Sequence, residues 1–349
     1  MKKTILILGA GRMVHAMVYD LNADYDITVA DINPKNLALF ESKYGLKTMQ
    51  LNVSDEDALT TAVQPYDLII GAVPGSFGYN MLKIVLKAGK WIVDISFSPE
   101  NALDLDELAK QHNALAIVDM GVAPGLSNLL LGHHNETMQV QRFVCQVGGL
   151  PVEKKWPYQY KAPFSPIDVI EEYTRPARIM RNNKIETLPA LAEPDLIDFK
   201  GVGELESFIT DGLRSLLFTM NIPNMEEKTL RYKGHRELME IYRETGLFST
   251  EEIMINGTAV RPLDVTAAKL LPHWLLEENE PEFTVMGIKI EGVENGQNVQ
   301  YTYFLLDYFD PKTGLSSMAR TTGCTCASAA RMLLETSFEA TGVFPPELL

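Results

Sequence analysis

The chain has 349 residues, a length typical of about two domains of ~150 residues each. Apolar residues make up 46% of the chain and charged residues 22%, a mixture that excludes a largely disordered protein. The net charge of −15, without a block of consecutive Lys or Arg, would repel a phosphate backbone. We therefore expect no nucleic-acid partner.

No segment reaches the ~18 apolar residues that a membrane helix needs. The first apolar run, Thr4–Leu8, stops at Gly9, too early for the apolar region of a signal peptide. Three cysteines are too few for a disulfide framework, and Cys324 and Cys326 point in different directions on a helix. These patterns predict a cytoplasmic protein with reduced thiols, no membrane partner and no metal site.

The first 120 or so residues alternate short apolar runs with helical patterns. The expected strands are Thr4–Leu8, Ile27–Ala30, Leu68–Val73, Trp91–Ile95 and Leu115–Val118. The expected helices are Met13–Leu21, Asn36–Tyr44, Glu56–Val63, Tyr79–Ala88 and Leu103–His112. Strand and helix in series predict a doubly wound parallel sheet with helices on both faces.

The pattern changes after about Gly121. Arg142–Val147 has the composition of a strand, and Asn295-Gly296 is a hairpin signal between the runs Phe283–Glu291 and Val299–Leu306. The tail Ala327–Glu339 has the composition of a helix, which could pack on the first domain. The fold class predicted is therefore α/β, with an N-terminal Rossmann sheet and a second α+β domain built on a mixed or antiparallel sheet.

The first strand runs into a glycine-rich turn. Gly9 permits the tight turn, and Gly11 lets the backbone approach a pyrophosphate. Arg12 and Met13 then begin a helix whose free amide groups and dipole favour an anion. Val14 stands where Gly or Ala is usual, so the fingerprint is imperfect.

Asp31 ends the second strand, about 20 residues beyond Gly11, where a carboxylate accepts hydrogen bonds from the adenosine ribose. A 2′-phosphate would meet a like charge there, so we expect NAD rather than NADP. The alternative is that Gly9 and Gly11 form only a tight turn and that Asp31 caps the helix near Asn36.

Two more loops follow strands at the edge where ligands bind in such sheets. Val73, Pro74 and Gly75 lie at the carboxyl end of the third expected strand and could run along the cofactor, or form only a turn. Asp94 lies at the carboxyl end of the next expected strand, where it could orient an amine or simply cap a helix or turn.

Several motifs together resemble the saccharopine dehydrogenase family, and the L-lysine 6-dehydrogenase branch most. The N-terminal motifs are Gly9-Ala-Gly11 with Asp31, Gly71–Gly75, Val93–Phe97 and Asp119–Asn128. The later and more specific ones are Val147–Pro151, Ile170–Arg178, Thr210–Ser215, Leu230–His235 and Met318–Arg320. Ala123 stands where saccharopine reductases of this family carry an Asp, which fits the lysine branch.

The resemblance implies that the chain consists of two domains with different functions. It implies an NAD-binding domain over residues 1–123, to which residues 323–349 return, and a substrate-binding and dimerisation domain over residues 124–322. It also implies a homodimer that oxidises the ε-amine of L-lysine with NAD. The products are ammonia and 2-aminoadipate 6-semialdehyde, which cyclises to piperideine carboxylate.

Such a reaction needs a group that binds the α-carboxylate of the amino acid, and a guanidinium does so with two parallel hydrogen bonds. Arg231 and Arg320 lie within the family-like strings, and Arg175 is a further candidate. Tyr173 could bind the α-amine. Each of these arginines could instead form a structural ion pair, and the tyrosine could serve only packing.

The reaction also needs a base to deprotonate the amine and activate water. His235 is the first choice because imidazole exchanges protons near neutral pH, although it could only cap the helix that follows. Asp94 and Asp211 are further candidates. Asp211 could instead pair with Arg214 three residues later, if both lie on one helix.

Two other functions remain open at this point. One is a saccharopine-type or carboxy-polyamine dehydrogenase, which would need a second site for a carboxylate. The other is an NAD-binding sensor without turnover, because fold alone does not fix function.

Overall fold

The computed structural model describes residues 2–164, 166–277, 279–336, 338 and 340–349. They form two compact units, residues 1–133 with 318–349 (unit 1) and residues 134–317 (unit 2). The borders fall inside α6 (Leu126–Thr137) and at the start of α11 (Ser317–Glu335), whereas the sequence placed them at 123/124 and 322/323. Each unit is described by itself.

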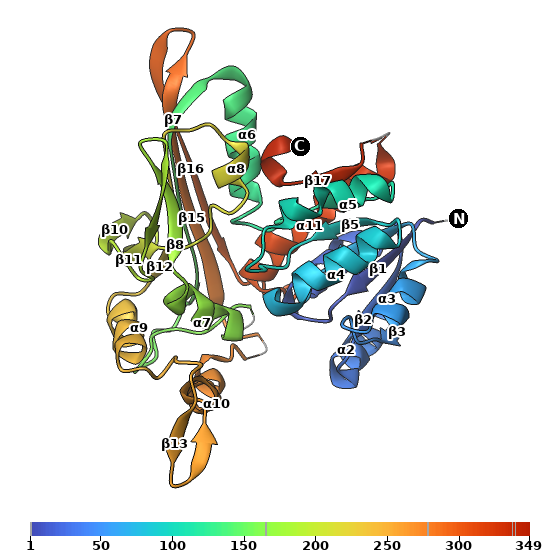
Figure 1. The fold of residues 1–349 in the computed structure, drawn as a ribbon, viewed down its shortest axis with the longest axis horizontal. Helices are drawn as coiled ribbons and strands as arrows, with labels where there is room; N and C mark the ends of the chain where they lie inside the picture. The colour runs from blue at the N-terminus through green and yellow to red at the C-terminus, as the bar shows by residue number, and fades with distance from the viewer. Residues whose placement is uncertain (1, 165, 278, 337, 339) are drawn as a thin grey trace. The chain divides into compact units, whose positions relative to one another are not determined.

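Unit 1 is built on a parallel sheet with strand order β17-β6-β5-β4-β1-β2-β3 (Figure 1). The strands are β1 (Thr4–Leu8), β2 (Asp26–Asp31), β3 (Lys47–Gln50), β4 (Leu68–Gly71), β5 (Trp91–Asp94), β6 (Leu115–Ile117) and β17 (Gly342–Phe344). The order reverses between β1 and β4, which creates the crevice where doubly wound sheets bind ligands. The predicted fold class is confirmed for this unit.

Helices cover both faces of this sheet, because successive strand residues point to opposite sides and both sides are apolar. The helices are α1 (Arg12–Leu21), α2 (Pro34–Tyr44), α3 (Glu56–Val63), α4 (Gly75–Lys87) and α5 (Asp106–Gln111), with the short 3₁₀ turns η1 (Ala102–Leu105) and η2 (Pro346–Leu348). Ile5 and Ile7 of β1 pack in one core with α1, α2 and α11, while Leu6 and Leu8 pack in the other with α3, α4 and α5.

The C-terminal segment belongs to unit 1. Cys326, Ala330 and Leu333 of α11 lie in the core beside α1, and β17 pairs with β6 in parallel. Gly323 permits this packing, since a Cβ there would stand 2.9 Å from that of Ala16. The predicted tail helix extends to residue 339, whereas α11 ends at Glu335; residues 337 and 339 lie outside the described residues.

Unit 2 contains a mixed sheet with main path β10-β11-β12-β7-β15-β16, in which β12 and β7 are parallel. Its strands are β7 (Gln139–Pro151), β8 (Ala177–Arg181), β9 (Lys184–Leu188), β10 (Asp195–Phe199), β11 (Gly203–Ile209), β12 (Asn224–Arg231), β15 (Glu282–Glu294) and β16 (Gln297–Tyr308). The hairpin predicted at Asn295-Gly296 joins β15 and β16 in antiparallel register. The mixed second sheet is therefore confirmed.

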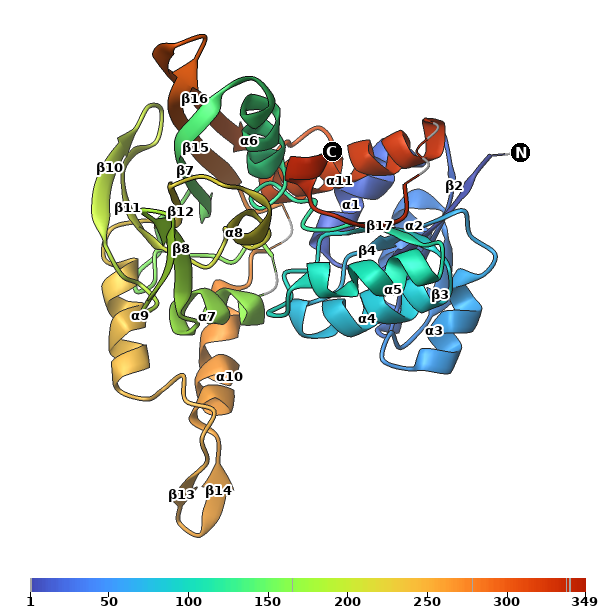
Figure 2. The same cartoon turned by 45° about the horizontal axis from the view of Figure 1, so that its top comes forward.

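Helices of unit 2 pack on this sheet through a large aromatic and aliphatic core. They are α7 (Pro166–Thr174), α8 (Leu216–Thr219), α9 (His235–Glu244) and α10 (Pro262–Trp274). Tyr173, Met239 and Trp274 reach this core from α7, α9 and α10, where they meet Phe208 of β11 and Phe283 of β15. A separate hairpin, β13 (Ile253–Ile255) and β14 (Thr258–Val260), extends beyond α10 (Figure 2).

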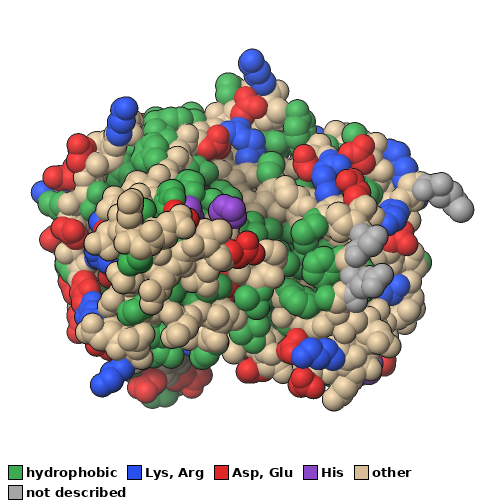
Figure 3. Space-filling view, turned by 90° about the horizontal axis from the view of Figure 1, so that it is seen from above, with side chains coloured by type: hydrophobic (Ala, Val, Ile, Leu, Met, Phe, Trp, Pro, Cys, Tyr) green, Lys and Arg blue, Asp and Glu red, His purple; other side chains and the backbone are tan. Residues whose placement is uncertain are grey.

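Acidic and basic side chains are interspersed over the face seen in Figure 3. Within the described residues, no helix is long and apolar enough to cross a membrane. The same residues contain no group of three or more His, Cys, Asp or Glu side chains placed to hold a metal ion.

Candidate functional site

The glycine turn of unit 1 lies at the point where the strand order reverses. Gly9 has φ +108°, and its N–H donates to the carbonyl oxygen of Ala30 at 2.7 Å. A Cβ at Gly9 would stand 2.3 Å from the carbonyl oxygen of Ala72, so only glycine fits between the ends of β2 and β4. The tight turn predicted at Gly9 is present for this reason.

Gly11 has a different role because its conformation is open to any residue. Its φ is −84°, and no described atom lies within 4 Å of the position that a Cβ would take. It is the N-terminal cap of α1 and makes no side-chain hydrogen bond to the first turn of that helix. Open space before a helix N-terminus suits the diphosphate of a dinucleotide. Val14 is fully buried in the hydrophobic core of unit 1.

Asp31 is fixed beside this turn by two backbone donors. Its Oδ2 accepts the N–H of Ala10 at 2.7 Å, and its Oδ1 accepts the N–H of Asn33, also at 2.7 Å. Asn33, not Asp31, caps α2, because its side chain accepts the N–H of Lys35 at 3.0 Å. The alternative that Asp31 serves as a helix cap is therefore wrong. The carboxylate is thereby fixed beside the glycine turn, and its contact with a ribose hydroxyl stays a prediction.

The segment Val73–Gly75 begins a helix and is not merely a turn. Pro74 is the N-terminal cap of α4, which starts at Gly75. A Cβ at Gly75 would stand 2.3 Å from the carbonyl oxygen of Phe97, so this glycine allows α4 to pack closely on the next loop. A contact of Val73 or Pro74 with a cofactor stays a prediction.

Asp94 lies at the carboxyl end of β5 but is only 1% exposed. Its Oδ1 accepts the hydroxyl of Ser96 at 2.8 Å, and a Cβ on Gly71 would overlap this oxygen. Burial, and next the charge of Asp94, raise the pKa of the Cys326 thiol. Arg320 belongs to the same unit, half-buried in the first turn of α11. Their proposed roles stay predictions.

In unit 2, three predicted site residues lie together in one buried chain of hydrogen bonds. Nε of Arg231 donates to Oη of Tyr173 at 3.0 Å, and Oη of Tyr173 lies 2.9 Å from Nε2 of His235. Nδ1 of His235 lies 2.8 Å from the carbonyl oxygen of Tyr158, which can only accept. The Nδ1 atom therefore carries the proton, and Tyr173 donates to Nε2.

Both terminal nitrogens of Arg231 also donate a hydrogen bond within the unit. Nη2 donates to Oε2 of Glu172 at 2.6 Å, Nη1 donates to the carbonyl oxygen of Leu230 at 2.9 Å, and the guanidinium lies 4.5 Å from the ring centre of Tyr160. Arg231 is 2% exposed. Binding a substrate carboxylate here would require Glu172 to leave.

The environment of His235 favours a neutral ring. Burial, and then the charge of Arg231, lower the pKa of His235 from its ordinary 6.5 to about 3. The side chain is 1% exposed and both ring nitrogens have partners. It lies at the first position of α9, after Gly234 as the cap, so it does not cap that helix. The geometry supports a structural link from α9 to α7 and β12.

Asp211 and Arg175 form ion pairs that the sequence did not assign. Arg178 donates to Asp211 through its backbone N–H and Nε at 2.9 Å and through Nη2 at 2.8 Å. Residues 210–214 are not helical and Arg214 has φ +45°, so the alternative in which Asp211 pairs with Arg214 along a helix is wrong. Arg175 pairs with Glu171 one turn earlier, at the end of α7.

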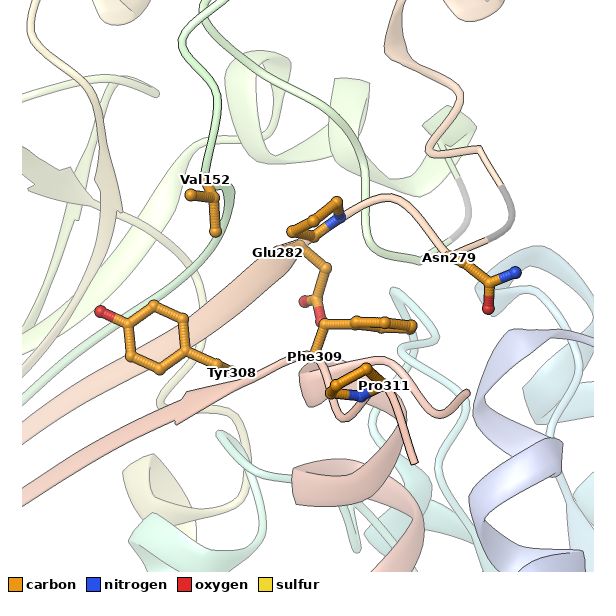
Figure 4. Close-up of a pocket in the computed structure, with 7 residues that line it drawn as sticks. Val152, Asn279, Glu282, Tyr308, Phe309 and Pro311 are labelled. Atoms are coloured by element: carbon orange, nitrogen blue, oxygen red, sulfur yellow. The ribbon is translucent and has the colours of Figure 1, made fainter. Parts of the chain in front are cut away.

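A pocket of about 500 Å³ opens in unit 2 at the paired ends of β15 and β16 (Figure 4). The labelled lining residues are Val152, Asn279, Glu282, Tyr308, Phe309 and Pro311. None of the residues predicted from the sequence lines it. This pocket could hardly be predicted from the sequence. Glu282 stands at the beginning of an apolar run, and the other lining residues come from three separate segments.

Comparisons with known proteins give the family. The model of the saccharopine dehydrogenase NADP binding domain matches residues 5–117, and that of the saccharopine dehydrogenase C-terminal domain matches residues 121–349. A saccharopine dehydrogenase (NADP+, L-glutamate-forming) of Saccharomyces cerevisiae is 25% identical, across 99% of this chain and 94% of that protein. The enzyme of the same description from Schizosaccharomyces pombe is 24% identical, across 98% of this chain and 93% of that protein.

Two further comparisons concern a partial match and a solved structure. A carboxyaminopropylagmatine dehydrogenase of Synechocystis is 23% identical over 68% of this chain and 61% of that protein. The solved structure of apo saccharopine dehydrogenase (L-Glu forming) from Saccharomyces cerevisiae has a TM-score of 0.80 at 20% identity, covering 99% of this chain and 94% of that one. This last comparison shows the shared fold.

Proposed function

Because this chain belongs to the saccharopine dehydrogenase family, we propose that it is an NAD-dependent dehydrogenase of an amino acid amine, with L-lysine as substrate. Dinucleotide binding is supported mainly by the glycine turn, with Asp31 held beside it by the N–H of Ala10. Oxidation of an amine is supported by the match of both family models across the chain.

The preference for NAD rests on charge. When bound, the nicotinamide dinucleotide supplies the hydride acceptor of the reaction. The Asp31 carboxylate supports NAD, because it accepts hydrogen bonds from ribose hydroxyls and repels a 2′-phosphate. The yeast relatives are described as NADP+ enzymes, so this preference sets the proposal apart from them.

The proposed reaction oxidises the ε-carbon of lysine. A proton leaves the ammonium, a hydride passes from the carbon to NAD+, and the C–N bond becomes an imine. Water then adds to the imine carbon and ammonia leaves, giving the aldehyde. The aldehyde can condense with the α-amine of the same molecule and lose water to form a ring.

The choice of a primary amine rests on the resemblance stated for Ala123. A carboxylate present at this position in saccharopine reductases of the family is replaced here by a methyl group. The buried positions of Arg231 and His235 leave the carboxylate-binding residue and the base as predictions to be tested separately.

The test is production of NADH by the purified chain with NAD+ and L-lysine, followed by its absorbance. Release of one ammonia for each NADH is expected. Saccharopine in place of lysine, and NADP+ in place of NAD+, are the matched comparisons. Turnover only with saccharopine would refute the lysine assignment, and turnover only with NADP+ would refute the cofactor assignment.

A second candidate is favoured by the relatives, whose names describe saccharopine and carboxyaminopropylagmatine dehydrogenases. It is oxidation of a secondary amine, which releases an amino compound instead of ammonia. The ammonia count distinguishes the two reactions. Thermal stabilisation by NAD without reduction by any amine would instead favour the sensor. The homodimer stays a prediction, for light scattering on a sizing column to test.

A further inference from the structure

A second pocket of unit 2 is lined mainly by carboxamide side chains. Its volume is about 410 Å³, and it lies where β7 and its parallel neighbour β12 begin. The carboxamides belong to Gln139, Gln141, Asn183, Asn221 and Asn224, and none of the described lining residues carries a charge. Each carboxamide has an oxygen that accepts hydrogen bonds and an NH2 group that donates two. The lining therefore offers donors and acceptors together.

A β-bulge at the start of β7 brings Gln141 to this pocket. The register of β7 against β15 shifts between Glu291 and Gly292. Their partners on β7 are Arg142 and Val140, so Gln141 is the extra residue. Gln141 and Arg142 are both exposed, whereas a regular strand would turn one of them to the opposite face. Bulges re-aim side chains in this way and are common beside binding sites.

The turn between β8 and β9 supplies Asn183 and is attached to the same place. The N–H of Asn183 donates to the carbonyl oxygen of Pro223 at 2.9 Å, and the N–H of Asn182 donates to Oδ1 of Asn224 at 3.1 Å. Nδ2 of Asn224 donates to the carbonyl oxygen of Gln141 at 3.5 Å. Asn224 therefore joins the turn, β7 and β12, and its own carboxamide is occupied in doing so.

The other four carboxamides are available to a ligand. No side-chain hydrogen bond joins any of them to a residue that the structure describes, and all four residues are exposed: Gln139, Gln141, Asn183 and Asn221. They lie around a cavity whose walls the main-chain bonds of the turn hold together. Groups that are already in place lower the entropic cost of binding.

A neutral molecule rich in hydroxyl groups matches this lining. A hydroxyl group both donates and accepts hydrogen bonds, as a carboxamide does. A charged ligand would lose hydration without a counter-charge among the lining residues, and an apolar ligand would leave the carboxamides without partners. The nearby charge of Arg142 is compensated by Glu226 at 3.3 Å and by Glu291 at 3.6 Å.

We propose that this pocket binds a small neutral polyhydroxyl compound, a monosaccharide or a polyol, through the carboxamides of Gln139, Gln141, Asn183 and Asn221. The volume lies within the range of small-molecule sites. The assignment goes beyond the proposed function and does not depend on it, because none of the residues predicted from the sequence lines this pocket.

The test titrates the whole chain, without cofactor, with D-glucose and with D-glucitol. Proton–nitrogen NMR spectra follow the side-chain NH2 signals of Asn and Gln. We expect the signals of the four carboxamides to shift and saturate, with a dissociation constant on the order of 1 mM, because neutral hydrogen bonds each contribute little. Saturation by glucose alone assigns the site to ring sugars, and saturation by glucitol alone assigns it to open-chain polyols.

D-Gluconate and cyclohexanol are the anionic and the largely apolar comparisons. We expect each to bind at least about tenfold more weakly than the better of the two neutral polyhydroxyl compounds. Absence of saturable shifts with both glucose and glucitol overturns the assignment. Equally tight binding of gluconate or of cyclohexanol overturns it as well.

The first variant is Gln141→Met, which keeps the length of the side chain and the main-chain oxygen that accepts from Asn224. Loss of one neutral hydrogen bond should weaken binding about fivefold, and the missing NH2 signal identifies that of Gln141. The matched control is Gln297→Met, at an exposed position of β16 that does not line the pocket. Equal affinity of Gln141→Met and wild type contradicts the proposal.

The second variant, Asn183→Gly, guards against misfolding of the first. Asn183 has φ +61°, which suits glycine, and the N–H that donates to Pro223 is retained. Asn256→Gly is the control, because Asn256 has φ +51° in the turn between β13 and β14 and does not line the pocket. We expect about fivefold weaker binding in Asn183→Gly and unchanged binding in Asn256→Gly. The same affinity in both variants would refute the site.

Discussion

The hydroxyl of Tyr173 lies 2.9 Å from Nε2 of His235 and receives the N–H of Arg231 at 3.0 Å, so one hydroxyl joins two buried nitrogen groups. These residues come from α7, α9 and β12. The sequence alone predicts His235 as a base and the other two as substrate-binding residues. In the fold they are one hydrogen-bond chain that ties two helices to the sheet.

Removing the hydroxyl of Tyr173 should therefore cost stability. Tyr173→Phe leaves one donor and one acceptor without partners in the core, and we expect a loss of about 1–3 kcal/mol in the free energy of unfolding. Tyr160→Phe is the matched control, because Oη of Tyr160 is buried and has no hydrogen-bond partner among the described residues. Urea unfolding should show no loss for Tyr160→Phe. Equal losses in both variants would contradict this network.

The ring of His235 should stay neutral well below pH 6.5. Its pKa is lowered to about 3 by burial and Arg231, so nitrogen NMR should show an unprotonated Nε2 at pH 5. The unfolded chain protonates this ring near 6.5, so its stabilising contribution is complete above that pH. It falls by about 1.4 kcal/mol per pH unit as the pH drops from 6.5 toward 3.

His15 also contributes to the loss of folding stability at acidic pH. Burial, followed by the charges of Lys43 and Arg12, lowers its pKa to about 4. The NMR signals of the two rings separate their effects. A His235 signal that titrates with a midpoint near 6.5 would restore this residue as a candidate base and contradict the buried geometry.

Arg231 should contribute mainly to stability. Arg231→Met removes the partner of Glu172 from a buried pair, and such a loss costs about 3–5 kcal/mol. Arg181→Met, at an arginine whose side chain is 37% exposed and pairs with Glu186 and Glu193, should cost less than about 1 kcal/mol. Denaturant unfolding measures both. Unchanged stability of Arg231→Met with a raised KM for the amino acid would support the carboxylate-binding role instead.

Substitutions at the two glycines of the turn should affect different properties: stability at Gly9 and NAD binding at Gly11. Gly9→Ala places a Cβ 2.3 Å from a carbonyl oxygen at φ +108°, so we expect a clear fall in thermal stability. Gly11→Ala meets no described atom within 4 Å, so the fold should be unaffected. Its methyl group would stand where the diphosphate approaches, and NAD binding should weaken by tenfold or more, about 1.4 kcal/mol. Intact NAD affinity in Gly11→Ala would place the diphosphate elsewhere.

Asp31 should set the choice of dinucleotide. Asp31→Asn keeps an oxygen for the N–H of Ala10 and removes the charge, so calorimetry should show NAD+ binding weakened about tenfold and NADP+ binding weakened less or improved. Asp26→Asn is the control, since Asp26 is exposed on the same strand and pairs with Lys47. An unchanged ratio of the two affinities in Asp31→Asn would show that this carboxylate does not read the ribose.

Much of the fold could be predicted because its signals are local. The apolar runs of β1, β4, β5 and β6 and the Asn295-Gly296 turn each identify an element within a few residues. β3 was missed because Lys47–Gln50 carries two polar side chains at its ends, and its pairing with β2 comes from the sheet. β17 was missed because three residues acquire strand geometry only beside β6.

The sequence by itself determined the glycine turn, the place of Asp31 and the two-part architecture, since these depend on short-range sterics and on the spacing of apolar residues. Only the tertiary structure decided that Arg231, Tyr173 and His235 are buried together, that Asp211 pairs with Arg178, and that Glu282 lines a pocket. Burial and ion pairing depend on which segments meet in space. A residue's type and its neighbours in sequence do not specify which distant segments will contact it.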